Sequence, residues 1–284
     1  MRERARAHGS ARAAAIAARR GGRVSDRARM DRPGSVAPSP SLAGSIAVAA
    51  ACLLVWWAVA SLRFGGRALI ATPWATLRAL PGAAPLLGID LAATLGRGVL
   101  GLAIGTIAGI VVGLAAAAVV RRAPIVEGLL DVARSVPPVV LLPVFLLGLG
   151  WNDGARVATV AAGCLWTMAL AVTTAARAPR SGRRELLALA GATRLQILAW
   201  TQPWESLGVL VVGLRSAAST AIVVTVVTEM LAGADHGIGS RVVTAQVAGD
   251  SVELTAAILA IGVTGWAINL GLRHLEARAR AVTG

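Results

Sequence analysis

Long apolar stretches separated by short polar segments make up most of the chain after its first forty residues. A helix that crosses a bilayer needs about 20 largely apolar residues, and the apolar stretches approach or exceed that length. Spanning helices are expected at residues 42–62, 92–120, 136–150, 156–176, 207–231 and 253–272. The pattern therefore predicts an all-α membrane protein with about six transmembrane helices.

The third stretch is short and is interrupted by proline. Pro137, Pro138 and Pro143 lack backbone donors, so a helix here must kink or break, which membranes tolerate beside protein or a water-filled cavity. Such breaks are common beside transport pathways, and Pro137 and Pro143 are candidates for a translocation path. A purely structural kink is the alternative. The charged segment 123–138 before it is expected at the cytoplasmic interface.

The distribution of arginine predicts the orientation of the chain in the membrane. All 28 basic residues are arginines, and cytoplasmic loops of membrane proteins collect such residues. Most of them precede the first span, follow the second or fourth, or lie after the last, whereas Arg63, Arg67, Arg78, Arg156 and Arg241 are left to outer loops. Both termini are therefore predicted to be cytoplasmic. This topology accounts for the net charge of +14 without a nucleic-acid ligand.

Residues 1–40 form an arginine-rich segment that is poor in branched apolar and aromatic residues. Such a composition cannot build a core, so a disordered cytoplasmic tail is expected before a permease-like domain at 41–284. A cleaved signal peptide ending near "AVAS" fits less well, because the basic region is too long. Translation from Met30 would leave a shorter leader.

Glycine recurs at every fourth position in the second predicted span, within "GLAIGTIAGIVVG". At 3.6 residues per turn, Gly101, Gly105, Gly109 and Gly113 lie along one face of a helix and allow another backbone to come close. Close helix packing is the simpler interpretation, and a direct place in a conducting path is the alternative. Either one indicates a bundle of several spans.

Few residues in the apolar stretches carry chemistry. Glu229 lies near the outer end of the fifth span and is a candidate for the translocation path, although snorkelling or helix capping would also account for it. The three histidines are far apart, so no metal site is expected, and the two cysteines fall in apolar runs, which argues against a disulfide framework. A chain without lysine has no phosphate-binding loop, so ATP hydrolysis would require another polypeptide.

The stretch "RRELLALAGATRLQILAW", 183–200, is unusual because it is amphipathic and lies between two spans. Leu186, Leu189 and Ala190 share one face of a first helix, Gly191 breaks it, and a second helix is expected from Thr193. The apolar face of this helix pair needs a partner. The bilayer surface and a groove on a second protein are both possible.

This stretch resembles the cytoplasmic coupling loop of ABC importer permeases, whose pattern is Glu-Ala-Ala, three residues and then Gly. The positions that correspond are Glu185, Leu186, Leu187, Gly191, Ala192 and Arg194, with leucine in place of both alanines. Pro203 also falls one position earlier than the proline usual in the family. "SVPPVVLLPVFLLGLG" and "TEMLAGADHGIGSRV" resemble further segments of the permeases for nitrate, taurine, aliphatic sulfonates and related small solutes. The similarity covers the chain from about Leu91 onward.

The resemblance implies a type I ABC importer permease fold, located in the bacterial inner membrane. It further implies a pair of permease chains, a cytoplasmic ATPase docked on each coupling loop at about 177–206, and an external binding protein that delivers the solute. No cofactor and no covalent chemistry of its own are expected. A secondary transporter or channel is the alternative, but neither an inverted repeat nor an intramembrane aspartate supports it. A membrane-embedded enzyme would need a catalytic set, and none is visible.

Overall fold

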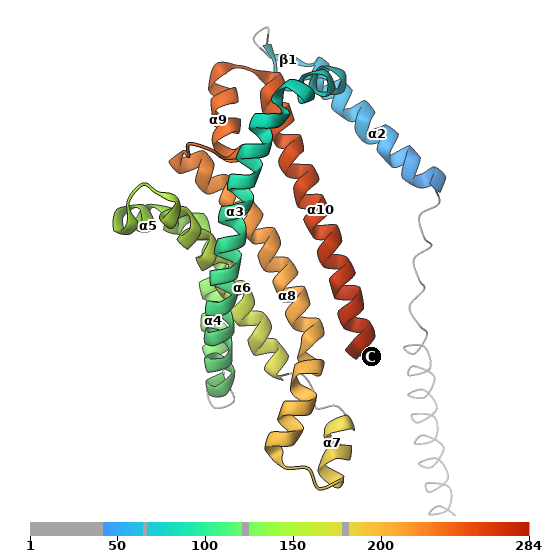
Figure 1. Ribbon diagram of the computed structural model, residues 1–284, viewed down its shortest axis with the longest axis vertical. Helices are drawn as coiled ribbons and strands as arrows, with labels where there is room; N and C mark the ends of the chain where they lie inside the picture. The colour runs from blue at the N-terminus through green and yellow to red at the C-terminus, as the bar shows by residue number, and fades with distance from the viewer. Residues whose placement is uncertain (1–41, 65–66, 121–124, 178–181, 284) are drawn as a thin grey trace, which may run out of the picture. The chain divides into compact units, whose positions relative to one another are not determined.

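A computed structural model describes residues 42–64, 67–120, 125–177 and 182–283. The chain divides into two compact units, Met1–Val55 and Trp56–Gly284. The predicted disordered tail at 1–40 lies outside the described residues. The elements in chain order are α2 (Leu42–Ser61), β1 (Arg63–Phe64), β2 (Arg67–Ala68), α3 (Pro73–Val120), α4 (Ile125–Ser135), η1 (Pro138–Leu141), α5 (Leu142–Leu149), α6 (Asp153–Arg177), α7 (Gly182–Leu189), α8 (Arg194–Ala232), α9 (Ile238–Ala248) and α10 (Ser251–Thr283) (Figure 1).

Within the described residues, four helices are long and apolar enough to cross a membrane. They are Pro73–Ala117, Asp153–Ala175, Leu207–Ala232 and Ser251–Arg278, and they correspond to the predicted spans at 92–120, 156–176, 207–231 and 253–272. The first predicted span, 42–62, is the apolar helix α2. The number of membrane crossings and the location of the termini remain predictions.

Helix α3 is much longer than the sequence pattern suggested. It begins at Pro73 and contains Pro81 and Pro85, whereas the prediction started at residue 92. Prolines interrupt the apolar pattern and favour a loop in a reading of sequence alone. In the structure the chain is already helical before residue 92. This added part of α3 packs against its neighbours, because Leu87 contacts Ile238 of α9 and Ala256 and Ala257 of α10.

The third predicted span is a broken helix. The segments Gly128–Ser135 and Pro138–Leu149 meet at an angle of 76°, so the break expected from the prolines is present. Pro138 lies against α6, where a Cβ atom added to Gly163 would approach the Pro138 Cγ atom to 2.8 Å. The bend at Pro137 is thus accommodated by a small residue on the neighbouring helix.

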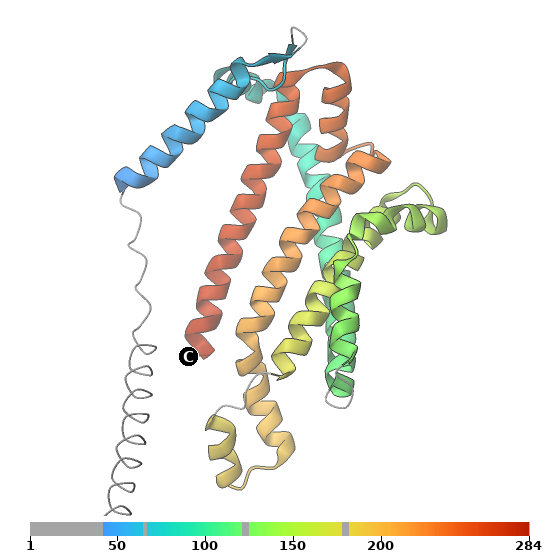
Figure 2. The ribbon, with the colours of Figure 1, turned by 180° about the vertical axis from the view of Figure 1, so that it is seen from behind.

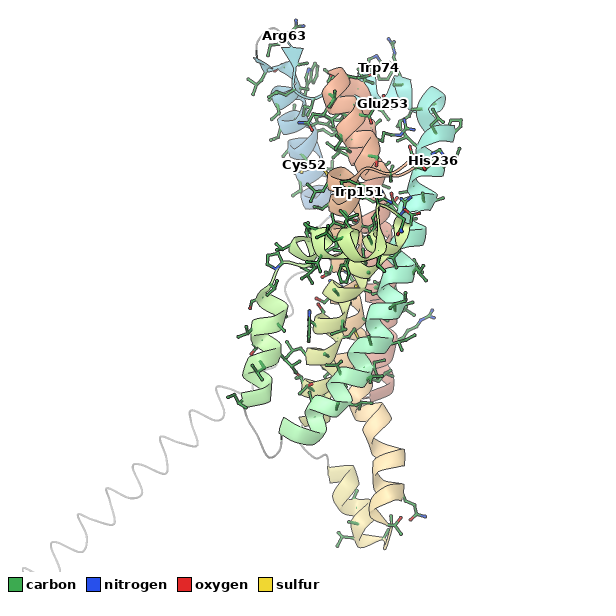
Figure 3. All side chains as sticks on the ribbon, turned by 90° about the vertical axis from the view of Figure 1, so that its left-hand side faces the viewer. Cys52, Arg63, Trp74, Trp151, His236 and Glu253 are labelled. Carbon is green, nitrogen blue, oxygen red and sulfur yellow. The ribbon has the colours of Figure 1, made fainter. Side chains whose placement is uncertain are left out.

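The interior of the second unit is formed mainly by α3, α6 and α8, which lie side by side (Figure 2). A buried cluster joins α6 to α8 and comprises Val160, Cys164, Met168, Ala217, Ala221 and Val224. Both cysteines are free thiols, and only Cys164 is buried. Trp74 and Glu253 lie at the end of the bundle opposite to α7 (Figure 3). This end, which also carries α9, is referred to below as the α9 end.

The four glycines of α3 lie directly against α6. A Cβ atom added at Gly101, Gly105, Gly109 or Gly113 would approach an α6 side chain to 2.7 Å or less, the partners being Val160, Cys164, Met168 and Val172. Real side chains do not come that close, so the two backbones touch along this face. The contact allows α3 and α6 to pack without intervening side chains.

We expect Gly105→Ala to lower the thermal stability of the purified protein. The added methyl group collides with the Cys164 Cβ atom at 2.6 Å and with the α6 backbone, and overpacking of this kind typically costs about 1–3 kcal/mol. Gly96→Ala on the same helix is the control, because nothing lies within 4 Å of the added atom. Equal melting temperatures of the two variants in detergent would contradict the packing interpretation.

Candidate functional site

The segment between α7 and α8 forms a compact helix–turn–helix. The Ala192 amide donates to Leu187 O (3.0 Å) and the Gly191 amide donates to Ala188 O (3.1 Å), which is the hydrogen-bond pattern of a Schellman motif. Gly191 has φ +82°, a conformation that glycine adopts without strain. The turn therefore depends on glycine at this position.

Helix α8 begins with a complete capping box directly after the turn. The Gln196 amide donates to Thr193 Oγ1 (3.3 Å), and the Thr193 amide donates to Gln196 Oε1 (2.9 Å). From there α8 continues for 39 residues to Ala232. The sequence suggested a short helix followed by a separate span, but the structure joins both into one helix.

Two leucines of α7 are uncovered. Leu186 is 68% exposed and Leu189 is 85% exposed, while Leu187 and Ala192 are half-buried. The side chains of Glu185 and Arg194 fall outside the described part of the structure. The two leucines form an apolar patch on α7. Among the described helices, α7 packs closely against α8 alone.

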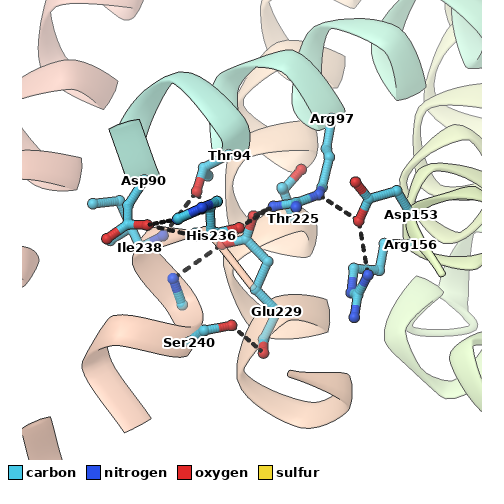
Figure 4. A network of polar contacts seen from close by, with 12 residues as sticks. Asp90, Thr94, Arg97, Asp153, Arg156, Thr225, Glu229, His236, Ile238 and Ser240 are labelled. Carbon is cyan, nitrogen blue, oxygen red and sulfur yellow. Dashed lines mark hydrogen bonds and ion pairs between the residues drawn. The ribbon is translucent and has the colours of Figure 1, made fainter. Parts of the chain in front are cut away.

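At the other end of α8, the Glu229 carboxylate is completely buried. Its Oε1 atom lies 2.7 Å from Arg97 Nη1, and its Oε2 atom accepts hydrogen bonds from Thr94 Oγ1 (2.9 Å) and the Gly239 amide (3.0 Å) (Figure 4). Snorkelling does not occur at this residue, because its carboxylate is fully buried, whereas capping does, because one of its donors is the Gly239 amide in the first turn of α9. The chain folds back over the carboxylate, since a Cβ atom on Gly237 would approach the Glu229 Cδ atom to 2.6 Å.

The same network fixes the beginning of α9. The amides of Gly237 and Ile238 donate to Asp90 Oδ1 (3.0 Å) and Thr94 Oγ1 (2.9 Å). Three side chains from α3 and α8, including Glu229, thus satisfy amides at a helix N-terminus, where negative charge is favourable. Arg241 pairs with Asp90 and with Glu253 on α10.

A second part of the network connects α3 with α6. Asp153 Oδ1 accepts from Arg97 Nε (2.8 Å) and from Arg156 Nη1 (2.7 Å). Arg156 also donates to Gly233 O and Ala232 O at the end of α8. Arg97 and Arg156 therefore connect α3, α6 and α8 at the α9 end of the bundle (Figure 4).

The sequence reading missed most of this network. Arg156 and Arg241 were expected only as residues of outer segments, and the structure adds that they lie in α6 and α9 and form ion pairs. The sequence did hold one hint of these ion pairs. Asp90, Asp153 and Glu229 lie at the ends of apolar runs, and arginines occur at the ends of neighbouring runs. Their pairing required the fold, because the partners are up to 151 residues apart.

The other predicted positions do not join this network. Pro137 precedes η1, and Pro143 lies in the first turn of α5, whereas the hydrogen bonds of Glu229 run to α3 and α9. A separate ion pair joins α8 to α10, where Arg215, in the middle of α8, pairs with Glu276 (2.8 Å) and donates to Asn269 Oδ1 (3.2 Å). Among the described residues, no group of three His, Cys, Asp or Glu side chains could hold a metal ion.

A small groove lies between α3, α8 and α10, next to the network. It is open on one side and is lined mostly by apolar residues, including Leu102, Ala221, Ile261 and Ile268, with Thr94 at its polar edge. Such a lining suits hydrocarbon better than a charged solute. The charged groups of this region are instead concentrated around Arg97.

Residues 105–277 match the family of binding-protein-dependent transport system inner membrane components. This match covers more than half of the chain, and the chain belongs to that family. The protein is thus a permease component of an ABC importer, a multi-pass protein of the bacterial inner membrane that forms a translocation path for a small solute. It is a transport subunit and not an enzyme, and its class works with an ATPase and a binding protein.

Particular relatives agree with this class. The taurine transport system permease protein TauC of Escherichia coli (strain K12) is 28% identical over an alignment of 248 residues, and the match covers 82% of this chain and 87% of TauC. Two crystal forms of the MetNI methionine ABC transporter in inward-facing conformations share the fold. One has a TM-score of 0.57 at 19% identity, covering 75% of this chain and 98% of its own. The other has a TM-score of 0.53 at 20% identity, and the match covers 74% of this chain and 97% of the MetNI chain.

We expect Glu229→Gln to destabilise the protein strongly. The substitution leaves Arg97 without its buried carboxylate partner, and breaking a buried ion pair typically costs about 3–5 kcal/mol. Asp131→Asn is the matched control, because its pair with Arg134 is about half-exposed on both sides and should contribute less than about 1 kcal/mol. Unfolding of both variants at the same temperature would show that the Glu229 pair adds no stability.

Proposed function

We propose that this permease imports a small sulfonate such as taurine, driven by ATPase subunits that dock on the segment 177–206. The solute class is supported by the similarity to TauC over most of both chains. The docking role is supported most directly by the turn at Gly191, which connects the exposed leucines of α7 to an unbroken α8.

The docking surface consists of the exposed apolar side chains of α7 and the turn that follows it. Leu186 and Leu189 provide apolar contact area, and an apolar helix face that fits a groove is a common mode of protein recognition. Leu187, Gly191 and Ala192 position this face, while Glu185 and Arg194 take their roles from the resemblance to the family's coupling loop. A partner whose groove receives this face contacts α7 and the start of α8.

Helix α8 transmits the movement of the ATPase subunits. A helix of 39 residues is about 58 Å long at 1.5 Å per residue, so a displacement at Arg194 moves the opposite end unless the helix bends. That end carries Glu229 and its ion pair with Arg97. Docking at α7 is thereby coupled to the packing of α3, α6 and α9.

The proposed orientation follows from this docking. The α7 end and both termini face the cytoplasm, and the α9 end faces the binding protein. Residues 1–40 form a cytoplasmic tail before the permease domain at 41–284.

Two copies of this chain pair in the membrane to form the path, which passes Pro137, Pro143 and Glu229. Exposed apolar side chains on α3, α8 and α10 provide surfaces for lipid and for the second copy.

Uptake of radiolabelled taurine tests the proposed solute. The permease, its ATPase and the binding protein are reconstituted in proteoliposomes, with ATP supplied on the ATPase side. We expect uptake that requires all three components and ATP, and that is competed by other short aliphatic sulfonates. ATP-dependent uptake of an amino acid but not of taurine would refute the sulfonate assignment while leaving the permease assignment intact.

We expect Gly191→Val to uncouple ATP hydrolysis from uptake. Valine is strained at φ +82°, so the turn opens and α7 shifts relative to α8. Ala190→Val is the control, because Ala190 is exposed and has an ordinary backbone conformation. ATPase association, solute-stimulated hydrolysis and uptake are measured separately. Normal uptake by Gly191→Val would show that the turn does not couple the subunits.

A further inference from the structure

Asp153 is held in an unusual way for an exposed carboxylate. A single oxygen, Oδ1, lies 2.8 Å from Arg97 Nε and 2.7 Å from Arg156 Nη1. The two arginine side chains are only 10% and 8% exposed, whereas the Asp153 side chain is 58% exposed. Two nearly buried cations are therefore bridged by an anion that is open to the surroundings.

The fold does not require Asp153 at this place for helix capping. Asn152 is the residue that caps α6, because its Oδ1 atom accepts a hydrogen bond from the Ala155 amide (3.2 Å). Asp153 is the first residue of α6 and adds negative charge where the helix N-terminus favours it. Any anion bound between the two arginines would gain the same electrostatic stabilisation.

Arg156 has donor capacity that Asp153 does not use. Its Nη1 atom binds Asp153 and its Nη2 atom binds backbone carbonyls at the end of α8, but its Nε atom is buried without a hydrogen-bond partner among the described residues. Leaving a buried donor unsatisfied is unfavourable. Guanidinium groups bind oxyanions best through two parallel hydrogen bonds, which one shared carboxylate oxygen does not provide.

The place between Arg97 and Arg156 that the Asp153 carboxylate fills is called the bridging position. The charges of Arg97, Arg156 and Glu229 are balanced only when an anion occupies it. Glu229 neutralises one of the two arginines, and the second requires the Asp153 carboxylate. A monovalent oxyanion in the bridging position would preserve this balance. The Asp153 side chain, which is already more than half exposed, would then rotate out into the solvent. Exchange of one carboxylate for one external anion therefore leaves no additional buried charge.

We propose that Arg97 and Arg156 form a binding site for a small monovalent oxyanion, such as a sulfonate or carboxylate, and that Asp153 occupies the site as an internal substitute. The site is at the α9 end of the bundle. On the proposed function and orientation, this end faces the binding protein, so the site receives the anionic group of the solute on its way into the path. Displacement of Asp153 also breaks the ion pair that Arg97 of α3 forms with α6.

Thermal stability of the full-length permease with its ATPase, in lipid nanodiscs, tests the site. Methanesulfonate is the probe, dimethyl sulfone is the uncharged analogue, and chloride at equal ionic strength controls for screening. Asp153→Ala empties the bridging position, so methanesulfonate should raise its melting temperature saturably. The half-saturating concentration should be about 10-fold lower than in the wild type, where the probe competes with the side chain.

Two further variants make the test decisive. Asp131→Ala removes another Asp that pairs with an Arg three residues away, and it should show no saturable effect. Asp153→Asn removes the charge but keeps the shape, and it replaces Asp153→Ala if the latter does not fold. The proposal is overturned if neither Asp153 variant responds, if chloride or dimethyl sulfone acts equally well, or if Asp131→Ala responds in the same way. Taurine uptake by the wild type tests the proposed function independently.

Discussion

The buried Glu229 carboxylate is the constraint on which the α9 end of this protein depends. A charge without water must be paired and hydrogen-bonded, because its desolvation is otherwise too costly. Arg97, Thr94 and the Gly239 amide meet that requirement from α3 and from the start of α9. The position of α9, the end of α8 and the middle of α3 are consequently fixed together.

The glycine face of α3 makes this arrangement possible. Gly101 to Gly113 bring α3 against α6 at backbone distance, which places Arg97 within reach of Asp153. Close packing and ion pairing thus support each other along the same helix. The network joins α3, α6, α8 and the start of α9, so a shift of any one of these helices would change the contacts of the others.

The two ends of α8 have different properties. At Gly191 the chain forms a tight, solvent-exposed turn with apolar side chains uncovered beside it, whereas at Glu229 it is buried and highly charged. One continuous helix connects them. This combination suits a subunit in which docking outside the membrane alters contacts at the far end, without any chemistry in the permease itself.

The sequence by itself determined the helical class, four of the spans, the break near Pro137, the glycine face and the helix–turn–helix around Gly191. Each of these follows from the order of neighbouring residues, since periodicity, proline and glycine act locally. Only the tertiary structure revealed the extension of α3 to Pro73 and the network of Asp90, Arg97, Asp153 and Glu229. Ion pairs between residues more than fifty positions apart leave no periodic signal, because a charged residue at the end of an apolar run looks the same whether water or another helix satisfies it.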